Sequence, residues 1–274
     1  DGSLLFSDVP RNAVFQWRPR GGVVAVLRSS GYTGEAPIVG NSPGSNGLTF
    51  DREGRLVLCQ HGDRRIARRE ADGQLAVVVD RYQGKRFNSP NDLVFDADGA
   101  LYFTDPTFGL ARGVDDPARE LDFQGVYRLG PDGVLTAIVT DLVAPNGLAF
   151  SPDGKTLYVS NAERANPIWM AYPVQPDGSV GPGRVFADAR AWVGESEALP
   201  DGLKVDERGN VFAAGPGGVH VFAPDGTRLG RIVTQAPTAN LAWGDDGHSL
   251  YIAADQRILR VRTATSGHVG GALR

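Results

Sequence analysis

The chain has 274 residues, of which 41% are hydrophobic and 22% are charged, and its formal net charge is −4. This length is enough for a sizeable core in one or two domains, and the slightly acidic balance excludes the basic surface that nucleic-acid binding requires. No apolar run is long enough to cross a bilayer as a helix, and the single cysteine, Cys59, excludes an internal disulfide.

A short motif recurs in chain order. Each copy has a polar or small residue, a short apolar strand, a turn that ends in glycine, and a second apolar strand. The copies begin at residues 46, 91, 146, 201 and 239, and their turn glycines are residues 54, 99, 154, 209 and 247. A sixth turn, Asp1-Gly2, opens the chain before the strand LLFSD.

The spacing of the copies predicts the fold. Further strands such as AVFQW, GVYRL and ILRVR follow the motif, and most of them lead into another glycine turn. Units of about 40–50 residues with four short strands each are typical of propeller blades. We therefore predict an all-β, six-bladed β-propeller of four-stranded antiparallel blades, with residues 1–274 forming a single domain.

The first residue of each copy precedes its turn glycine by the same offset of eight (54 − 46, 99 − 91, 154 − 146, 209 − 201 and 247 − 239). We call these first residues the start positions: Asn46, Asn91, Asn146, Asp201 and Ala239. The innermost strand of a propeller blade lines the central channel, so the start positions are expected to form a ring at one mouth. Amide and carboxylate oxygens suit a hard cation such as Ca²⁺; taken singly, the same residues are also common in turns.

The first copy is incomplete. The offset from Gly2 falls before residue 1, so we expect the innermost strand of the first blade, and its start position, to be missing from this sequence. One carboxylate among neutral amides binds a dication weakly. The absent residue, upstream of Asp1, is therefore expected to be acidic.

Several strings resemble one family in order and spacing. They are LLFSDVPRNAVFQW, SNGLTFDREGRLVLCQHGDRRI, RFNSPNDLVFDADGALYFTDPTFG, LDFQGVYRL, APNGLAFSPDGKTLYVSN and LPDGLKVDERGNVF. The chain resembles the SMP-30/gluconolactonase/LRE family, and most of all its bacterial gluconolactonases. The resemblance implies one divalent metal, usually Ca²⁺, held by Asn91, Asn146 and Asp201 together with a Glu at the missing position. Where related lactonases have a histidine, this chain has Asn46, which is expected to face the substrate as a donor because an amide cannot act as a general base.

The resemblance implies hydrolysis of a sugar lactone such as glucono-1,5-lactone to the aldonic acid, a reaction of carbohydrate metabolism. The metal, Ca²⁺ or another divalent cation, would polarise the carbonyl for attack by water, with Asp201 as the candidate base. Asn91 is also a candidate to touch the substrate. Asp105, Thr107 and Arg112, which follow the second strand of the third copy, are candidates to bind sugar hydroxyls, although ordinary loop polarity explains them equally well.

Two other functions remain open at this point. One is a promiscuous phosphotriester or aryl-ester hydrolase that uses the same metal site, and the other is a non-catalytic propeller that binds a ligand or a protein. The expected partner is a small lactone, with no nucleic acid and no membrane, and the chain is a monomer or a dimer. A cytoplasmic and a periplasmic location are equally compatible with the sequence.

Some residues are expected to be purely structural. His61 follows a buried strand and is expected to be a satisfied core histidine. The basic cluster Arg64, Arg65, Arg68 and Arg69 is expected to be a solvated face.

Overall fold

The computed structural model describes residues 2–36, 40 and 42–267; Asp1, half of the predicted first turn, lies outside them. The described residues form 24 β-strands and two short 3₁₀ helices. Within this part of the chain, no helix has the length and apolar character needed to cross a membrane.

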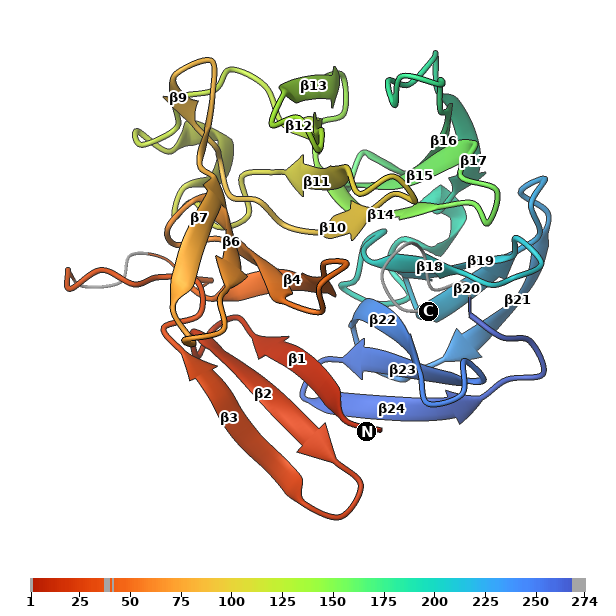
Figure 1. Cartoon of the computed structure of the whole chain (residues 1–274). Coiled ribbons are helices and arrows are strands. Elements are labelled where there is room, and N and C mark those ends of the chain that lie inside the picture. The colour runs from red at the N-terminus through yellow and green to blue at the C-terminus, as the bar shows by residue number, and fades with distance from the viewer. Residues whose placement is uncertain (1, 37–39, 41, 268–274) are drawn as a thin grey trace. The chain divides into compact units, whose positions relative to one another are not determined.

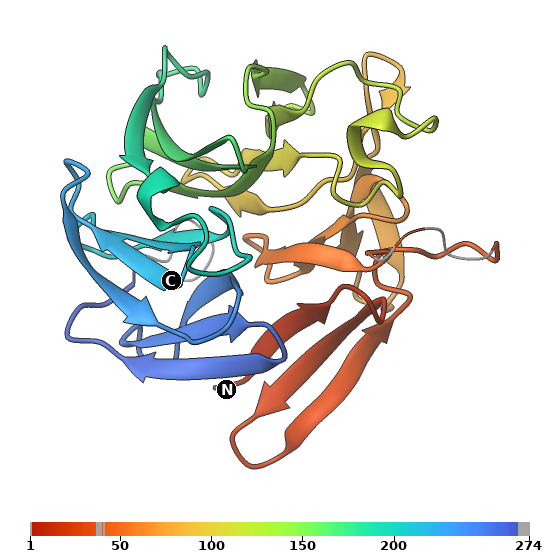
Figure 2. The same cartoon turned by 180° about the vertical axis from the view of Figure 1, so that it is seen from behind.

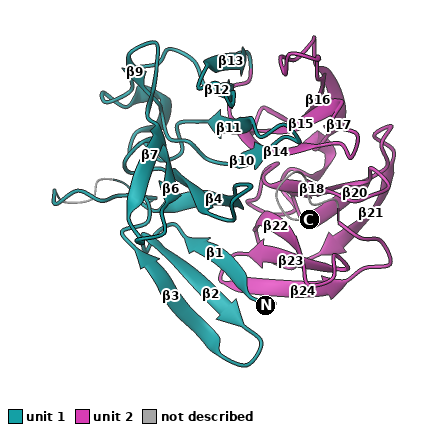
Figure 3. Ribbon diagram, in the orientation of Figure 1, with its two compact units in different colours: residues 1–141, 271–274 teal, residues 142–270 magenta. Residues whose placement is uncertain are grey.

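The chain separates into two compact units, of which one extends to Asp141 and the other begins at Leu142 (Figure 3). Each unit contains three antiparallel sheets of three or four strands that follow one another in chain order, and the first unit also holds a two-stranded hairpin. The prediction of a single domain stays a prediction.

The first unit holds the first three sheets (Figure 1). They are β1 (Leu4–Asp8), β2 (Ala13–Arg18) and β3 (Gly22–Arg28); β4 (Ser45–Phe50), β5 (Leu56–Gln60), β6 (Arg65–Arg69) and β7 (Leu75–Val79); and β10 (Leu93–Phe95), β11 (Leu101–Asp105), β12 (Gly125–Leu129) and β13 (Leu135–Val139). The connections carry the small hairpin β8 (Arg81–Tyr82) and β9 (Lys85–Arg86) and the 3₁₀ helix η1 (Gly113–Asp115).

The second unit holds the other three sheets, whose strands lie side by side in both views (Figure 1, Figure 2). They are β14 (Pro145–Phe150), β15 (Thr156–Glu163), β16 (Asn166–Pro173) and β17 (Arg184–Asp188); β18 (Leu203–Val205), β19 (Val211–Gly215), β20 (Gly218–Phe222) and β21 (Arg228–Val233); and β22 (Thr238–Gly244), β23 (Ser249–Ala254) and β24 (Arg257–Arg262). The 3₁₀ helix η2 (Arg190–Trp192) lies between β17 and β18.

These six sheets are the blades of a six-bladed β-propeller, as the sequence predicts. Four sheets have four strands, and the first and last have three among the described residues. The first sheet begins with β1 directly after the turn at Gly2, so its strands correspond to the second, third and fourth strands of a complete blade.

The recurrent glycine turns have one conformation. The turn glycines have positive φ angles between 69° at Gly154 and 90° at Gly99, a region that glycine enters without steric cost. In the copy that begins at Asn46, the Gly54 N–H donates to the Asp51 carbonyl (3.0 Å), while the Asp51 side chain accepts from the Glu53 and Arg55 N–H groups. Asp96 and Asp206 make the same side-chain contacts in their own turns.

The core lies between neighbouring blades inside each unit. In the first unit, Cys59 and Ile66 of the second sheet pack with Phe103 and Tyr127 of the third. In the second unit, one cluster centred on the fully buried Trp169 joins the fourth and fifth sheets, and another joins the fifth and sixth. Blades covered on both faces explain why central strands such as β5 and β11 are buried at every residue.

Candidate active site

In the first unit, Asn46 and Asn91 are the start positions, and each lies where an innermost strand begins. Asn46 is the second residue of β4, and Asn91 comes two residues before β10. The backbones of the two blades touch here, because the Gly47 N–H donates to the Asn91 carbonyl oxygen at 2.7 Å. The contact requires glycine: a Cβ at Gly47 would lie 2.7 Å from that oxygen and 2.8 Å from the Asp92 Cα.

The second unit repeats this arrangement. Asn146 is the second residue of β14, and Asp201 comes two residues before β18. A Cβ at Gly147 would lie only 2.5 Å from the Asp201 carbonyl oxygen. One blade further, the Gly202 N–H donates to the Ala239 carbonyl at 2.8 Å, as Gly47 does to Asn91. The start positions predicted from the sequence are therefore structurally equivalent within each unit.

The side chains at the start positions offer oxygen donors. Asn91 and Asn146 are buried, with 3% and 7% of their surfaces exposed, and Asp201 is half-buried. Within residues 2–36, 40 and 42–267, no group of three or more His, Cys, Asp or Glu side chains is arranged to hold a metal ion. A metal site among these residues would therefore depend on amide or backbone oxygens, and such donors fit Ca²⁺ better than Zn²⁺.

Asn46 has a partner that the sequence does not reveal. Its Nδ2 lies 3.3 Å from Nε2 of His61, a residue that is only 2% exposed. Burial lowers the pKa of His61 to about 4, so the ring is neutral at physiological pH. Gln60 of β5 pairs with Ser45 of β4 in antiparallel register, and this pairing shifts between Ser45 and Leu48, where Asn46 approaches His61.

Asp105 lies in the protein interior and fixes the segment that leads to Asn91. It is completely buried, and its two carboxylate oxygens accept the backbone N–H groups of Asn88 and Ser89, both at 2.8 Å. Burial raises the pKa of Asp105 to about 7, although these two hydrogen bonds and nearby arginines act in the opposite direction. The geometry gives this carboxylate an anchoring contact with backbone.

Thr107 and Arg112 belong to the long loop between β11 and β12. The Thr107 N–H and hydroxyl both donate to Oε1 of Gln124 (2.8 and 3.3 Å), and Thr107 is 5% exposed. Arg112 is exposed to solvent, and its backbone N–H donates to Asp116. At Gly109 this loop packs against His61 and Ser89, since a Cβ there would lie 2.7 Å from the Cβ atoms of both residues.

The basic cluster of the second sheet corrects one expectation. Arg64 is 4% exposed rather than solvated: its Nε donates to the Phe87 carbonyl (2.6 Å) and its Nη1 to the Ala118 carbonyl (2.7 Å). Arg64 lies directly before β6 and has a positive φ of 60°, so it is not part of the strand and its side chain does not follow the exposed face expected for the cluster. It therefore ties the β11–β12 loop to the segment before Asn91.

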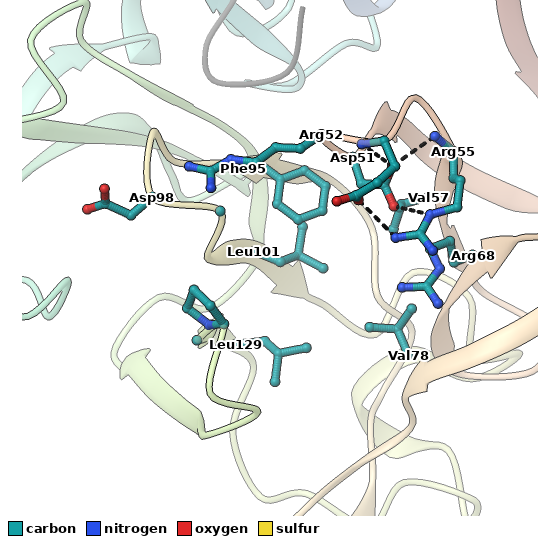
Figure 4. Close-up of a pocket in the computed structure, with 14 residues that line it drawn as sticks. Asp51, Arg52, Arg55, Val57, Arg68, Val78, Phe95, Asp98, Leu101 and Leu129 are labelled. Carbon is teal, nitrogen blue, oxygen red and sulfur yellow. Dashed lines mark hydrogen bonds and ion pairs between the residues drawn. The ribbon is translucent and has the colours of Figure 1, made fainter.

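A pocket of about 280 Å³ lies at the other ends of β4 and β10, away from Asn46 and Asn91 (Figure 4). Phe95, Leu101 and Leu129 are among its lining residues. Its guanidinium groups have partners: Arg55 pairs with Asp51 and Glu53 (2.8 and 2.9 Å), and Arg68 with Glu70 (2.6 Å). Arg52 also lines the pocket, and its guanidinium donates to the neutral Ala97 carbonyl.

Comparison with known proteins adds the family. Residues 1–256 match the family described as the SMP-30/Gluconolactonase/LRE-like region. The chain belongs to this family. The match covers both units and includes all five start positions.

Relatives in the SMP-30/gluconolactonase/LRE-like family include named lactonases. The chain is 42% identical over 270 residues to a gluconolactonase of Zymomonas mobilis, covering 96% of this chain and 76% of the relative. It is 30% identical over 214 residues to the pentonolactonase XacC of Haloferax volcanii, covering 75% of this chain and 65% of the relative. A solved structure of a gluconolactonase from Xanthomonas campestris matches with a TM-score of 0.81 and 37% identity, covering 95% of this chain and 82% of that one.

Proposed function

We propose that this member of the SMP-30/gluconolactonase/LRE-like family hydrolyses a sugar lactone, such as glucono-1,5-lactone, to the aldonic acid. The chain is a lactone hydrolase, as its gluconolactonase and pentonolactonase relatives indicate. The observation that carries the sugar-lactone proposal is the set of oxygen-bearing side chains at equivalent start positions, two of them buried amides. Amide and carboxylate oxygens are the donors that a hard cation prefers, so this set of side chains favours a metal-assisted hydrolysis.

Asn91, Asn146 and Asp201 are the residues that would hold a divalent cation, Ca²⁺ in the first instance. Their donor chemistry fits a hard cation, as described above. When bound, the cation supplies a positive charge that polarises the lactone carbonyl and favours negative charge on its oxygen. The two neutral amides leave that charge largely uncompensated.

Asp201 is the proposed general base. Its backbone is held on two sides, because its N–H donates to the Ala214 carbonyl (3.0 Å) and its carbonyl accepts the Ser160 hydroxyl. In the proposed reaction the carboxylate takes a proton from water as the water oxygen bonds to the carbonyl carbon. The bond from that carbon to the ring oxygen then breaks, and the ring oxygen takes up the proton. The product aldonic acid ionises and releases one proton to solvent.

Asn46 and Arg112 are the proposed contacts for the sugar hydroxyls. Asn46 is half-buried beside Asn91, and Arg112 is exposed on the loop that packs over His61 through Gly109. Thr107 and Asp105 shape this loop through the Gln124 and Asn88 contacts described above. A ligand with several hydroxyl groups suits such a set of amide and guanidinium groups.

The test is proton release from glucono-1,5-lactone in weak buffer, corrected for spontaneous hydrolysis. Asp201→Asn keeps the volume and removes the base, so kcat should fall by about 10²–10⁴-fold. The matched control is Asp225→Asn, which alters an exposed turn carboxylate that accepts the Thr227 N–H. Wild-type activity on a phosphotriester with none on lactones would replace the proposal with the phosphotriesterase alternative, and an Asp201→Asn variant as active as the control would remove Asp201 from the mechanism.

A further inference from the structure

We propose that His61 is a positioning residue that fixes the orientation of the Asn46 amide and thereby the contact of the site with a substrate hydroxyl. The inference rests on the proposed function, because it assigns a role to the side chain that faces the sugar. It starts from the 3.3 Å approach of Nδ2 of Asn46 to Nε2 of His61.

The protonation of His61 decides which groups meet. The ring is neutral and therefore carries a single N–H. Burial lowers the pKa of His61 despite an opposing contribution from the Ser42 backbone, and Nδ1 is buried with no hydrogen-bond partner among the described residues. The atom of Asn46 that faces Nε2 is the amide nitrogen, which can only donate, so we assign the proton of the neutral ring to Nδ1 and Nε2 is left as the acceptor.

An acceptor at Nε2 selects one of the two orientations of the amide. Only the NH₂ group of Asn46 can donate to it, because the amide oxygen would meet a lone pair instead. The Asn46 Oδ1 is then held on the side away from His61, together with the second N–H. Asn46 therefore presents an acceptor of fixed direction as well as the donor that the sequence predicts.

The histidine is held firmly enough to play this role. Its backbone N–H donates to the Gly44 carbonyl (3.2 Å), and Gly109 packs directly against its Cβ. The next residue, Gly62, is equally close to Tyr32, since a Cβ there would lie 2.6 Å from the Tyr32 Cβ. These contacts fix the backbone and the Cβ of His61, and burial restricts the space open to its ring.

This role predicts a loss that depends on the substrate. Without the acceptor, the amide flips freely and the hydroxyl contact is made only part of the time. His61→Leu should lower kcat/KM for glucono-1,5-lactone about tenfold more than for δ-valerolactone, a lactone of the same ring size without hydroxyl groups, because one neutral hydrogen bond is at stake. The loss should appear mainly in KM.

Two variants separate positioning from packing. His220→Leu is the matched control, because His220 is also completely buried, its pKa is also lowered to about 4 by burial, and its Nε2 contacts the Pro216 carbonyl rather than a start position. His61→Gln is the rescue variant, because its amide oxygen can accept the same Asn46 N–H. We expect His61→Gln to regain part of the discrimination, and His220→Leu to affect both lactones equally.

The double variant His61→Leu/Asn46→Ala completes the experiment. If His61 acts through Asn46, the double variant discriminates between the lactones no worse than Asn46→Ala alone. Equal losses on both lactones in His61→Leu, or additive losses in the double variant, would overturn the inference while the lactonase proposal stands. A wild-type enzyme that hydrolyses neither lactone would overturn the proposed function itself.

Discussion

The buried carboxyl group of Asp105 makes the stability of the fold depend on pH in a direction unusual for an aspartate. Its pKa is about 7 in the folded chain, against 3.8 as the ordinary value. The folded state therefore holds this proton more tightly than the unfolded state does. The resulting stabilisation is present in full at low pH and is lost as the pH rises towards 7.

The magnitude follows from the two pKa values. Between pH 4.5 and pH 8, the free energy of unfolding should lose about 3 kcal/mol through this one group. Asp105→Asn removes the titration, because an amide of the same size cannot ionise. The free energy of unfolding of the wild type minus that of the variant should therefore fall by about 3 kcal/mol between pH 4.5 and pH 8.

Urea unfolding of both proteins at several pH values measures this difference. Taking variant against wild type at each pH cancels the contributions of other titrating groups. Asp153→Asn is the control of opposite sign, because the Ser151 hydroxyl lowers the pKa of this exposed carboxyl. A wild-type-minus-variant difference for Asp105 that is flat with pH, or that grows as the pH rises, would refute the reasoning.

Three further predictions follow from the same contacts. Gly147→Ala places a Cβ 2.5 Å from the Asp201 carbonyl oxygen and should lower the free energy of unfolding by about 1–3 kcal/mol, measured by thermal or urea unfolding. Gly230→Ala, where an added Cβ has no atom within 4 Å, should change it by about 0.5 kcal/mol or less. Equal effects of the two substitutions would contradict the close approach of the blades. His220→Leu should reduce the loss of stability as the pH falls from 6.5 towards 4, because the buried His220 ring stays neutral in the folded chain while the same ring is protonated in the unfolded chain. An acid-unfolding transition unchanged by the substitution would contradict this. Gln124→Leu should raise KM for glucono-1,5-lactone several-fold by releasing Thr107, and steady-state kinetics that match wild type would show that this loop does not reach the substrate.

Much of the fold could be predicted because one motif repeats with a fixed offset. The positive φ at each turn glycine and the close approach at Gly47 and Gly147 are local demands that leave a direct trace in the sequence. The start positions follow from the same offset. The equivalence of the start positions within each unit could therefore be predicted from the repeated motif alone, without knowledge of contacts between distant residues.

The contacts around the site could not be predicted in the same way. Every residue of β11 is buried, because blades cover both faces, so alternation does not reveal that Asp105 turns towards the Asn88–Ser89 backbone. His61 and Asn46 meet where the antiparallel pairing of β4 and β5 shifts register, and the sequence does not reveal this shift. Arg64 was misjudged because its left-handed backbone conformation breaks the strand pattern.

The central claim is that oxygen donors at the start positions support lactone hydrolysis with a divalent cation. The most direct test is the rate of glucono-1,5-lactone hydrolysis after exhaustive treatment with chelator, followed by titration with Ca²⁺, for wild type and for Asn146→Ala. We predict that chelation abolishes the enzymatic rate, that Ca²⁺ restores it in wild type, and that Asn146→Ala needs a much higher Ca²⁺ concentration. A chelated wild-type enzyme that retains its full rate, or an Asn146→Ala variant with an unchanged Ca²⁺ dependence, would contradict the account.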